Sequence, residues 1–522
     1  MTPVALDGES LSIAEVVTVA RSWRHPEAVP VTLTPAAEER VCACQEIVVR
    51  LVARQAIVYG VTTGFGSFKD RFIGPDQAGE LQRNLIVSHA AGVGRPLSEA
   101  AVRALMLIRA NTLAKGYSGI RVETLQALLD LLNRGVHPVI PEQGSVGASG
   151  DLAPLAHMAL VLIGQGEALY QGRRMSGAKA LQRSGLKPVE LQAKEGAALI
   201  NGTSFMAAVG CLAADQARTL TQTADIVAAL SLEALQGTPR AFDARLHALR
   251  PHAGQVACAA HLRALLEGSE LVRCDQDKNL HDAYTLRCIP QVHGAVRDVV
   301  EHVEHVLGIE LNAATDNPLI FQQGDDGIAL SGGNFHGEPV APAMDYLGLA
   351  LTDLGNMSER RIARLLDPAT NGGVLPPALT EQGGLHSGFA ILQYTAAALA
   401  SENKILAHPA SADSIPTSAN AEDHVSMGAT AARKAAQIVE HVETIVGLEL
   451  MCAAQGIDFR RQRQPTLRLG KGSAAAYAAI REQVPFIVSD EVLYPHIERA
   501  RSLVHSGQIA RAAQLAIASG AA

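Results

Sequence analysis

The chain has 522 residues, 48% of them hydrophobic, and a formal net charge of -8, so it is long and apolar enough to bury a large core. No window offers the roughly 18 uninterrupted apolar residues of a membrane helix, and basic residues are mixed with acidic ones along the chain. These features exclude a membrane-spanning protein and provide no electrostatic surface for nucleic acid.

The N-terminal part contains several signals for helix starts and ends. Asp7 and Glu9 stand where a secretion signal would carry positive charge and an apolar run, so we expect a cytoplasmic protein. The Ser12 to Glu15 spacing is that of a capping box, and Thr34-Pro35 is a second typical helix start. Residues 99–116 and 122–135 repeat apolar side chains at helical spacing and end in glycine.

Beyond residue 205 the sequence is dominated by long segments rich in alanine and leucine, at 207–237, 292–311, 338–366, 388–408 and 424–456. Strand patterns are confined to short pieces such as 29–34 and 318–321. We therefore predict a mainly α fold, with a long central helical bundle (206–522) and a smaller, loop-rich N-terminal part (1–205). The mean hydropathy of the chain is +0.12, which indicates more apolar helix surface than one copy buries. We expect this surface to form contacts between copies of the chain.

Residues 144–157, GSVGASGDLAPLAH, form a loop of small residues followed by an acid. The serine lacks the G-x-S-x-G spacing of a hydrolase nucleophile. Glycine at 150 leaves its amide nitrogen free of steric hindrance, so that this nitrogen can approach the carbonyl carbon of Ala148. Cyclisation of the Ala148-Ser149-Gly150 tripeptide is therefore geometrically feasible.

The same loop resembles the signature of the aromatic amino acid ammonia-lyase and aminomutase family. Further matches occur in the family's order at residues 58–66, 82–94, 201–204, 282–288, 315–319, 331–339 and 400–404. The resemblance implies that Ala148, Ser149 and Gly150 form a 4-methylidene-imidazol-5-one electrophile autocatalytically, with Asp151 beside it to assist maturation. It also implies that no dissociable cofactor is needed.

The resemblance assigns roles to other residues. Tyr59, in a glycine-bounded loop, is expected to remove the β-proton of the substrate, and Tyr284 lies one helical turn before Arg287, whose guanidinium fork suits a carboxylate. Asn201 resembles the amide that holds the amino or carboxylate group of the substrate. Phe335 resembles the aromatic wall of the pocket.

Two positions indicate the substrate. The pair Ser88-His89 is similar to that of histidine ammonia-lyases, and a histidine at 89 can satisfy an imidazole where an apolar residue cannot. Glu402 likewise resembles the histidine enzymes, and a carboxylate there would orient the imidazole. The segment PTSANAEDHVSM (416–427) is also closer to those enzymes.

Four positions depart from the histidine pattern: Ser204, His281 in the expected substrate pocket, Thr285 and Ala390. We therefore expect elimination of ammonia from L-histidine to give trans-urocanate, with three alternatives left open. These are a lyase acting on tyrosine, phenylalanine or an imidazole analogue, a 2,3-aminomutase, and an inactive structural homologue.

The family resemblance further implies a homotetramer with active sites shared between subunits. No metal is expected, because the pair His302 and His305 has no third ligand at a zinc-site spacing. The seven cysteines are scattered and odd in number, which favours neither a disulfide framework nor a zinc site.

Overall fold

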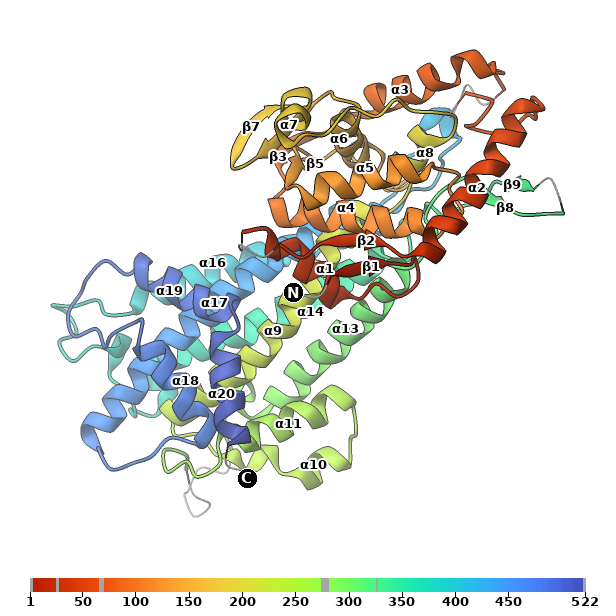
Figure 1. The fold of residues 1–522 in the computed structure, drawn as a ribbon. Helices are drawn as coiled ribbons and strands as arrows, with labels where there is room; N and C mark the ends of the chain where they lie inside the picture. The colour runs from red at the N-terminus through yellow and green to blue at the C-terminus, as the bar shows by residue number, and fades with distance from the viewer. Residues whose placement is uncertain (1–2, 25–27, 65–69, 274–280, 325–326, 520–522) are drawn as a thin grey trace. The chain divides into compact units, whose positions relative to one another are not determined.

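Helices dominate the computed structural model of the chain, which describes all residues except 1–2, 25–27, 65–69, 274–280, 325–326 and 520–522 (Figure 1). The strands are short and pair in small sheets of two or three. The predicted mainly helical class is confirmed. Cys274 and Gly66 lie outside the described residues.

The start signals in the sequence mark the starts of the first two helices. The Ser12 hydroxyl accepts from the Glu15 amide ahead of α1 (Ile13–Arg21), and the Glu15 carboxylate accepts from the Ser12 amide. Thr34 caps α2 (Pro35–Ala53), with proline at the first helical position. These caps supply partners for amides that the helices themselves leave unpaired.

One of two compact units, unit 1, comprises residues 1–215, 303–345 and 409–433. Its central helix is α4 (Glu99–Ala114), in which every residue from 101 to 114 is buried. Helix α4 contacts α1, α2 and α5 (Val122–Asn133), while α6 (Leu152–Leu162) contacts α3 (Ala78–His89) and α8 (Glu195–Ile200). The burial of α4 on all sides makes it a rigid support for the loops around it.

Four small sheets complete unit 1. They are parallel β1–β2 (Val4–Leu6, Val31–Leu33), antiparallel β3–β5 (Val93–Pro96, Pro141–Gln143), antiparallel β4-β6-β7 (Val136–Pro138, Glu167–Tyr170, Arg173–Ser176) and antiparallel β8–β9 (Leu319–Phe321, Ile328–Leu330). The short helices are η1 (Ser22–Arg24), η3 (Pro75–Gln77), α7 (Gly177–Ser184) and η6 (Ser418–Asn420). The predicted strand pieces 29–34 and 318–321 contain β2 and β8.

Unit 2 comprises residues 216–302, 346–408 and 434–522. Four long helices have residues in both units, namely α9 (Ser204–Ala234), α13 (Ile289–Glu310), α14 (Ala341–Leu366) and α17 (Gly428–Arg463). The other helices of unit 2 are η4 (Pro239–Phe242), α10 (Ala244–Ala248), α11 (Ala253–Leu265), α12 (Tyr284–Arg287), α15 (Pro368–Asn371), η5 (Pro377–Leu379), α16 (Ala390–Leu406), α18 (Lys471–Arg481), α19 (Tyr494–His505) and α20 (Gln508–Ala518).

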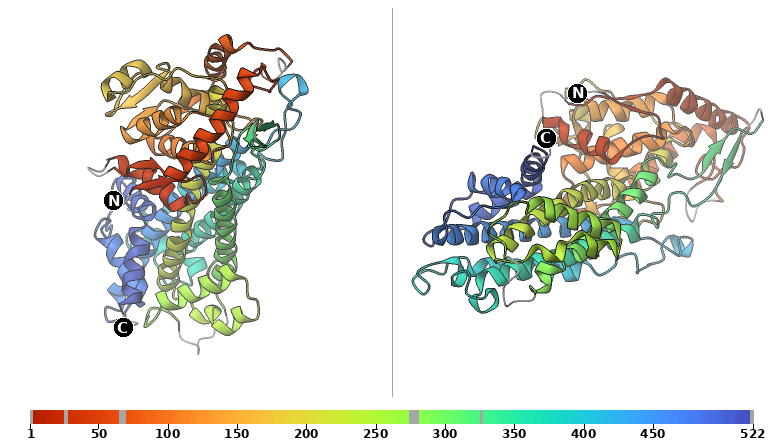
Figure 2. Two further views of the ribbon diagram at one scale, coloured as in Figure 1. Left: turned by 45° about the vertical axis from the view of Figure 1, so that its right-hand side comes forward. Right: turned by 90° about the horizontal axis from the view of Figure 1, so that it is seen from below.

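Buried hydrogen bonds join the long helices within unit 2, where Figure 2 shows them running alongside one another. Ser231 on α9 and Arg361 on α14 both donate to the carboxylate of Glu449 on α17, and Ser358 donates to its second oxygen. These bonds connect helices that are far apart in the sequence. The predicted division at residues 205–206 falls in the first turn of α9, whereas unit 1 extends to residue 215.

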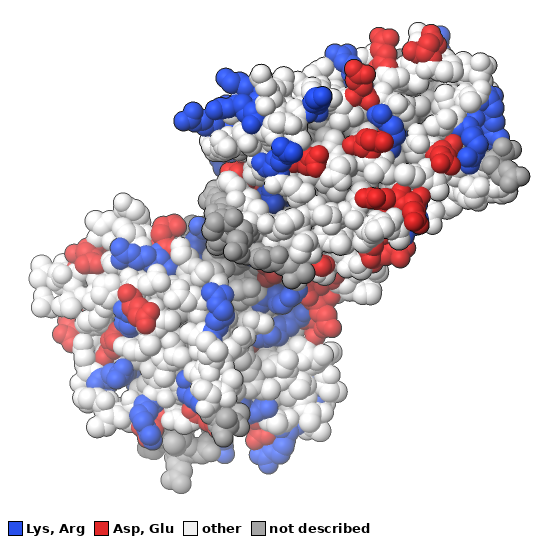
Figure 3. Space-filling view, in the orientation of Figure 1, with Lys and Arg blue, Asp and Glu red and all other residues white. Residues whose placement is uncertain are grey.

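The surface carries both signs of charge. On the face shown in Figure 3, lysine and arginine side chains are interspersed with aspartate and glutamate. Among the residues that the structure describes, none of the helices combines the length and the apolar character needed to cross a membrane.

Candidate active site

The Ala148-Ser149-Gly150 tripeptide forms a loop between β5 and α6 in unit 1. The Gly202 amide donates to the Ser149 carbonyl oxygen at 3.2 Å, and the Asp151 amide donates to the Gly202 carbonyl oxygen at 2.7 Å. Gly150 has a φ of +72°, and a Cβ there would lie 2.2 Å from the Gly202 carbonyl oxygen. Only glycine fits, because a side chain would be strained and would clash. The small residues therefore permit two backbone segments to approach closely.

Asp151 directly follows the tripeptide in the sequence, and its carboxyl is fully buried. It accepts from the Ser145 hydroxyl at 2.9 Å and from the amides of Phe205 and Met206, in the first turn of α9, at 3.1 and 2.9 Å. Burial raises the pKa of Asp151 to about 7, although these hydrogen bonds oppose the rise. Near neutral pH this carboxyl can both give and take a proton.

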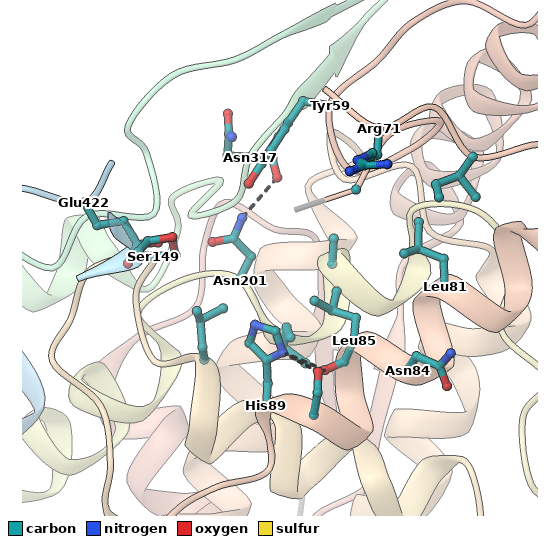
Figure 4. Close-up of a pocket in the computed structure, with 17 residues that line it drawn as sticks. Tyr59, Arg71, Leu81, Asn84, Leu85, His89, Ser149, Asn201, Asn317 and Glu422 are labelled. Atoms are coloured by element: carbon teal, nitrogen blue, oxygen red, sulfur yellow. Dashed lines mark hydrogen bonds between the residues drawn. The ribbon is translucent and has the colours of Figure 1, made fainter. Parts of the chain in front are cut away.

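A cavity of about 710 Å³ lies beside the tripeptide, and all of its lining residues belong to unit 1. Its polar lining consists of Tyr59, Arg71, Asn84, Ser88, His89, Ser149, Asn201, Asn317, Ser418 and Glu422 (Figure 4). Tyr59, His89, Ser149 and Asn201 were expected from the sequence. The structure brings these four together from separate segments of the chain.

Tyr59 is half-buried at the edge of the cavity, on a loop that is tied to α3. The Gln82 side-chain amide on α3 donates to the Gly60 carbonyl oxygen at 3.3 Å, and the Gly60 amide donates to the Thr63 hydroxyl at 3.2 Å. Gly60 has a φ of +66°, so the turn after Tyr59 favours glycine.

His89 ends helix α3, and one of its ring nitrogens is already bonded. Nδ1 lies 2.8 Å from the Leu85 carbonyl oxygen and 3.1 Å from the Ser88 hydroxyl. Because a carbonyl oxygen can only accept, Nδ1 carries the hydrogen in the neutral ring and Nε2 has the lone pair. Figure 4 shows the other ring nitrogen, Nε2, pointing into the cavity. The cavity is thus lined by a hydrogen-bond acceptor suited to the N–H of a ring.

Asn201, at the C-terminal end of α8, offers a second acceptor. Its Nδ2 donates to the Asn317 carbonyl oxygen at 3.0 Å, while its Oδ1 is buried without a hydrogen-bond partner among the described residues. A buried polar atom without a partner is costly, so such an atom in a cavity indicates a ligand group. A donor such as an ammonium group would satisfy it.

Glu422 is a cavity residue that the sequence reasoning did not single out, although it lies in the segment 416–427. The Ser149 hydroxyl donates to Glu422 Oε1 at 3.2 Å, and the Thr417 hydroxyl donates to Oε2 at 2.7 Å. The sequence offered one signal for this residue: it is a carboxylate inside a segment that resembles the corresponding segment of the histidine enzymes. Its contact with Ser149 spans 273 residues of sequence, so the pattern could not reveal it.

Five further residues expected from the sequence do not line this cavity. Phe335 is half-buried in unit 1, whereas His281, Tyr284, Arg287 and Glu402 belong to unit 2. Tyr284 is 68% exposed, and the Arg287 guanidinium carbon lies 4.7 Å from its ring centre, as expected for residues one helical turn apart. The Arg287 Nε has no hydrogen-bond partner in the part of the chain that the structure describes.

The Glu402 carboxylate is exposed on α16. Nε2 of His441 lies 3.9 Å from Glu402 Oε2. Such an exposed pair contributes little to stability. The Glu402 carboxylate is therefore available for other contacts.

A buried cluster in unit 2 has the residue types of a metal site, namely Asp225, Cys258 and His293. The Asp225 carboxylate already accepts from the Cys258 thiol at 3.2 Å, from His293 Nδ1 at 2.8 Å and from His261 Nδ1 at 3.0 Å, and it also accepts from Arg297. Burial acts to raise the pKa of Asp225, but Arg297 and the two histidines hold it well below its usual range. Four donors occupy this carboxylate, so the cluster acts as a structural network.

Comparisons with known proteins are consistent from one end of the chain to the other. The family model described as aromatic amino acid lyase matches residues 11–482. The histidine ammonia-lyase of Chloroflexus aurantiacus is 58% identical over 512 residues, covering 98% of each chain. The crystal structure of histidine ammonia-lyase from Trypanosoma cruzi has a TM-score of 0.89 at 42% identity, covering 98% of this chain and 95% of that one. Tyrosine aminomutase from Streptomyces globisporus has a TM-score of 0.92 at 40% identity, covering 98% and 99%.

Proposed function

The chain belongs to the aromatic amino acid lyase family, and we propose that it is a histidine ammonia-lyase, which eliminates ammonia from L-histidine to give trans-urocanate. One observation carries the proposal. The cavity beside the Ala-Ser-Gly tripeptide is lined by His89, whose acceptor nitrogen faces inward and matches the N–H of an imidazole. The assignment to a carbon-nitrogen lyase also agrees with the relatives named above.

The tripeptide fits the formation of a ring from the chain itself. Ring closure joins the Gly150 nitrogen to the Ala148 carbonyl carbon with loss of one water, and loss of the Ser149 hydroxyl with its α-hydrogen removes a second. The lack of a side chain at Gly150 and the support from Gly202 suit this closure. Once formed, the 4-methylidene-imidazol-5-one group supplies an electrophile that turns the amino group of the substrate into a leaving group.

Asp151 and Glu422 are placed to move protons during this maturation. Asp151 has a pKa of about 7 directly after the tripeptide, so it can take up a proton near neutral pH. Glu422 accepts the hydrogen bond of the Ser149 hydroxyl, which is the group that must leave. After that hydroxyl has left, Glu422 Oε1 is available to substrate while Thr417 still holds Oε2.

The remaining cavity residues orient the substrate. Tyr59 is proposed to take the β-proton, and Asn201 Oδ1 to accept from the substrate ammonium group. His89 Nε2 is proposed to accept from the imidazole ring. A phenyl ring in the same place would leave that nitrogen unpaired, which costs about 1–3 kcal/mol and favours histidine over phenylalanine.

We further propose a homotetramer in which other copies of the chain supply Tyr284, Arg287, His281, Phe335 and Glu402 to each cavity. Two observations support this arrangement: Tyr284 is exposed, and the Arg287 Nε finds no hydrogen-bond partner within the described part of the chain. Arg287 would then hold the substrate carboxylate through parallel hydrogen bonds. A cytoplasmic location stays a prediction.

An apolar face on α16 supports the same assembly. Ile391, Tyr394 and Ile405 lie on one side of this helix and are 57%, 70% and 73% exposed. Large apolar side chains grouped on one helix face favour contact with another protein surface. Size-exclusion chromatography with light scattering would test the tetramer, and a monomer with full activity would contradict the shared site.

The similarity to tyrosine aminomutase keeps one alternative in view, because an aminomutase would return the amine to the β-carbon. Incubation with L-histidine, L-tyrosine and L-phenylalanine, followed by chromatography, separates the two outcomes. We expect urocanate from histidine as the main product. Faster conversion of tyrosine or phenylalanine, or a β-amino acid product, would overturn the proposal.

A further inference from the structure

Arg109 is a fully buried arginine on α4, and its polar partners are main-chain carbonyl groups. Its Nη1 donates to the Asn201 carbonyl oxygen at 2.6 Å, and its Nη2 donates to the carbonyl oxygen of Ala198. A third carbonyl oxygen, that of Thr315, lies 3.5 Å from Nη1. Burial lowers the pKa of Arg109 to about 10, so the guanidinium stays charged at neutral pH.

The three carbonyl groups belong to two segments that Arg109 ties together. Ala198 and Asn201 lie at the C-terminal end of α8, where carbonyl oxygens lack helical partners and where a cation is favoured. Thr315 precedes Asp316, whose buried carboxylate accepts from Lys194 at 2.7 Å. One guanidinium fork therefore joins the end of α8 to the segment 315–317.

Gly202 lies between this guanidinium and the reactive tripeptide. A Cβ on Gly202 would lie 2.0 Å from the Thr315 carbonyl oxygen and 2.7 Å from Arg109 Nη1, so the fit on that side is tight. On its other side Gly202 bonds to the main chain of Ser149 and Asp151 and pairs with Gly150. A displacement of the guanidinium would thus reach the tripeptide through a single residue.

We propose that Arg109 is a positioning residue for formation of the electrophile: it fixes the Asn201-Gly202 backbone against which the Ala148-Ser149-Gly150 loop closes. Ring closure requires the Gly150 nitrogen to be held close to the Ala148 carbonyl carbon. Gly202 supports the loop through its main-chain hydrogen bonds to Ser149 and Asp151. The inference rests on the proposed function, because it concerns the ring that function requires.

A matched control exists on the same helix. Arg103 is also buried on α4, and its Nε and Nη1 donate to the carbonyl oxygens of Val19 and Leu132 at 3.0 and 2.8 Å. Burial lowers its pKa to about 10 as well. None of these partners belongs to the tripeptide or to the segment around Gly202. A loss caused by general destabilisation of unit 1 should therefore appear in variants of both arginines.

The experiment compares Arg109→Lys and Arg109→Met with Arg103→Lys and Arg103→Met. Intact mass measured on denatured protein gives the fraction of chains that have lost two waters, and thermal unfolding gives the stability of each variant. Lysine keeps the charge but cannot bind several carbonyl groups as a fork does. We expect the ring-bearing fraction to fall about tenfold in Arg109→Met and less in Arg109→Lys, and to stay at the wild-type level in both Arg103 variants.

Three results would overturn the proposal: folded Arg109→Met with the full loss of two waters, an equal fall in the Arg103 variants, or Arg109 variants that fail to fold where the Arg103 variants fold. The last result would assign Arg109 to general stability. A wild-type chain without the mass loss would instead contradict the proposed function itself.

Discussion

Replacing Glu422 with glutamine tests which carboxylate faces the reactive tripeptide. Glu422 Oε1 accepts from the Ser149 hydroxyl at 3.2 Å, and Thr417 holds Oε2 at 2.7 Å. Once the Ser149 hydroxyl has left, Oε1 can accept a hydrogen bond from the substrate; glutamine keeps the shape but removes the charge, so a charged hydrogen bond worth about 1.5–3 kcal/mol is lost. We expect kcat/KM for L-histidine to fall roughly ten- to hundredfold.

The matched comparison is Glu402→Gln. Glu402 is exposed, and in the proposed tetramer it reaches the cavity of another copy, whereas Glu422 accepts directly from the Ser149 hydroxyl. Glu402→Gln should therefore also lower kcat/KM for L-histidine, but by less than Glu422→Gln, and it should leave the loss of two waters intact. Intact masses of both variants separate loss of the ring from loss of turnover. A Glu422→Gln variant that forms the ring and turns over like wild type would exclude a role for this carboxylate. A larger loss of activity in Glu402→Gln than in Glu422→Gln would assign the main role to Glu402 instead.

Three further predictions follow from the cavity. Ser149→Ala should fold and lose activity by several orders of magnitude, because no hydroxyl remains to eliminate; turnover close to wild type would refute the electrophile. His89→Leu should shift the ratio of kcat/KM for histidine to that for phenylalanine toward phenylalanine, and an unchanged ratio would show that His89 does not bind the ring. Burial raises the pKa of Asp151 to about 7, above its value of about 4 in an unfolded chain, so its contribution to stability is complete below about pH 4 and is lost as the pH rises toward 7. The melting temperature of Asp151→Asn, measured from about pH 5 to 8, should therefore rise relative to wild type, and a constant difference would contradict the raised pKa.

Local sequence signals were sufficient for much of the fold. The capping residues Ser12 and Thr34 act through neighbours a few positions away, so their helices begin where the pattern predicts. The long segments rich in alanine and leucine form α9, α13, α14, α16 and α17 for the same reason. Helix α4 differs, because burial of all its residues from 101 to 114 depends on helices that pack around it from elsewhere in the chain.

Site residues were predictable where a chemically suitable side chain lies inside a recognisable motif. Tyr59, His89, Ser149 and Asn201 were identified in this way, and all four line the cavity. Glu422 was not identified, because its contact with Ser149 depends on folding that brings together two residues 273 positions apart in the sequence.

The role of Arg109 could not be predicted from the sequence for a different reason. Its partners are main-chain carbonyl groups, which carry no signature in the sequence. The sequence pattern around an arginine on an apolar helix is the same whether its side chain points to solvent or supports a site. Only the packing around α4 distinguishes the two.

The most direct test of the proposed lyase and its ring is incubation of the wild-type protein with L-histidine, with urocanate and ammonia quantified and the intact mass recorded on the same sample. We expect equimolar urocanate and ammonia from a chain whose mass is lower than that of its sequence by two waters. β-Histidine in place of urocanate, or no product from a chain of unmodified mass, would contradict this expectation.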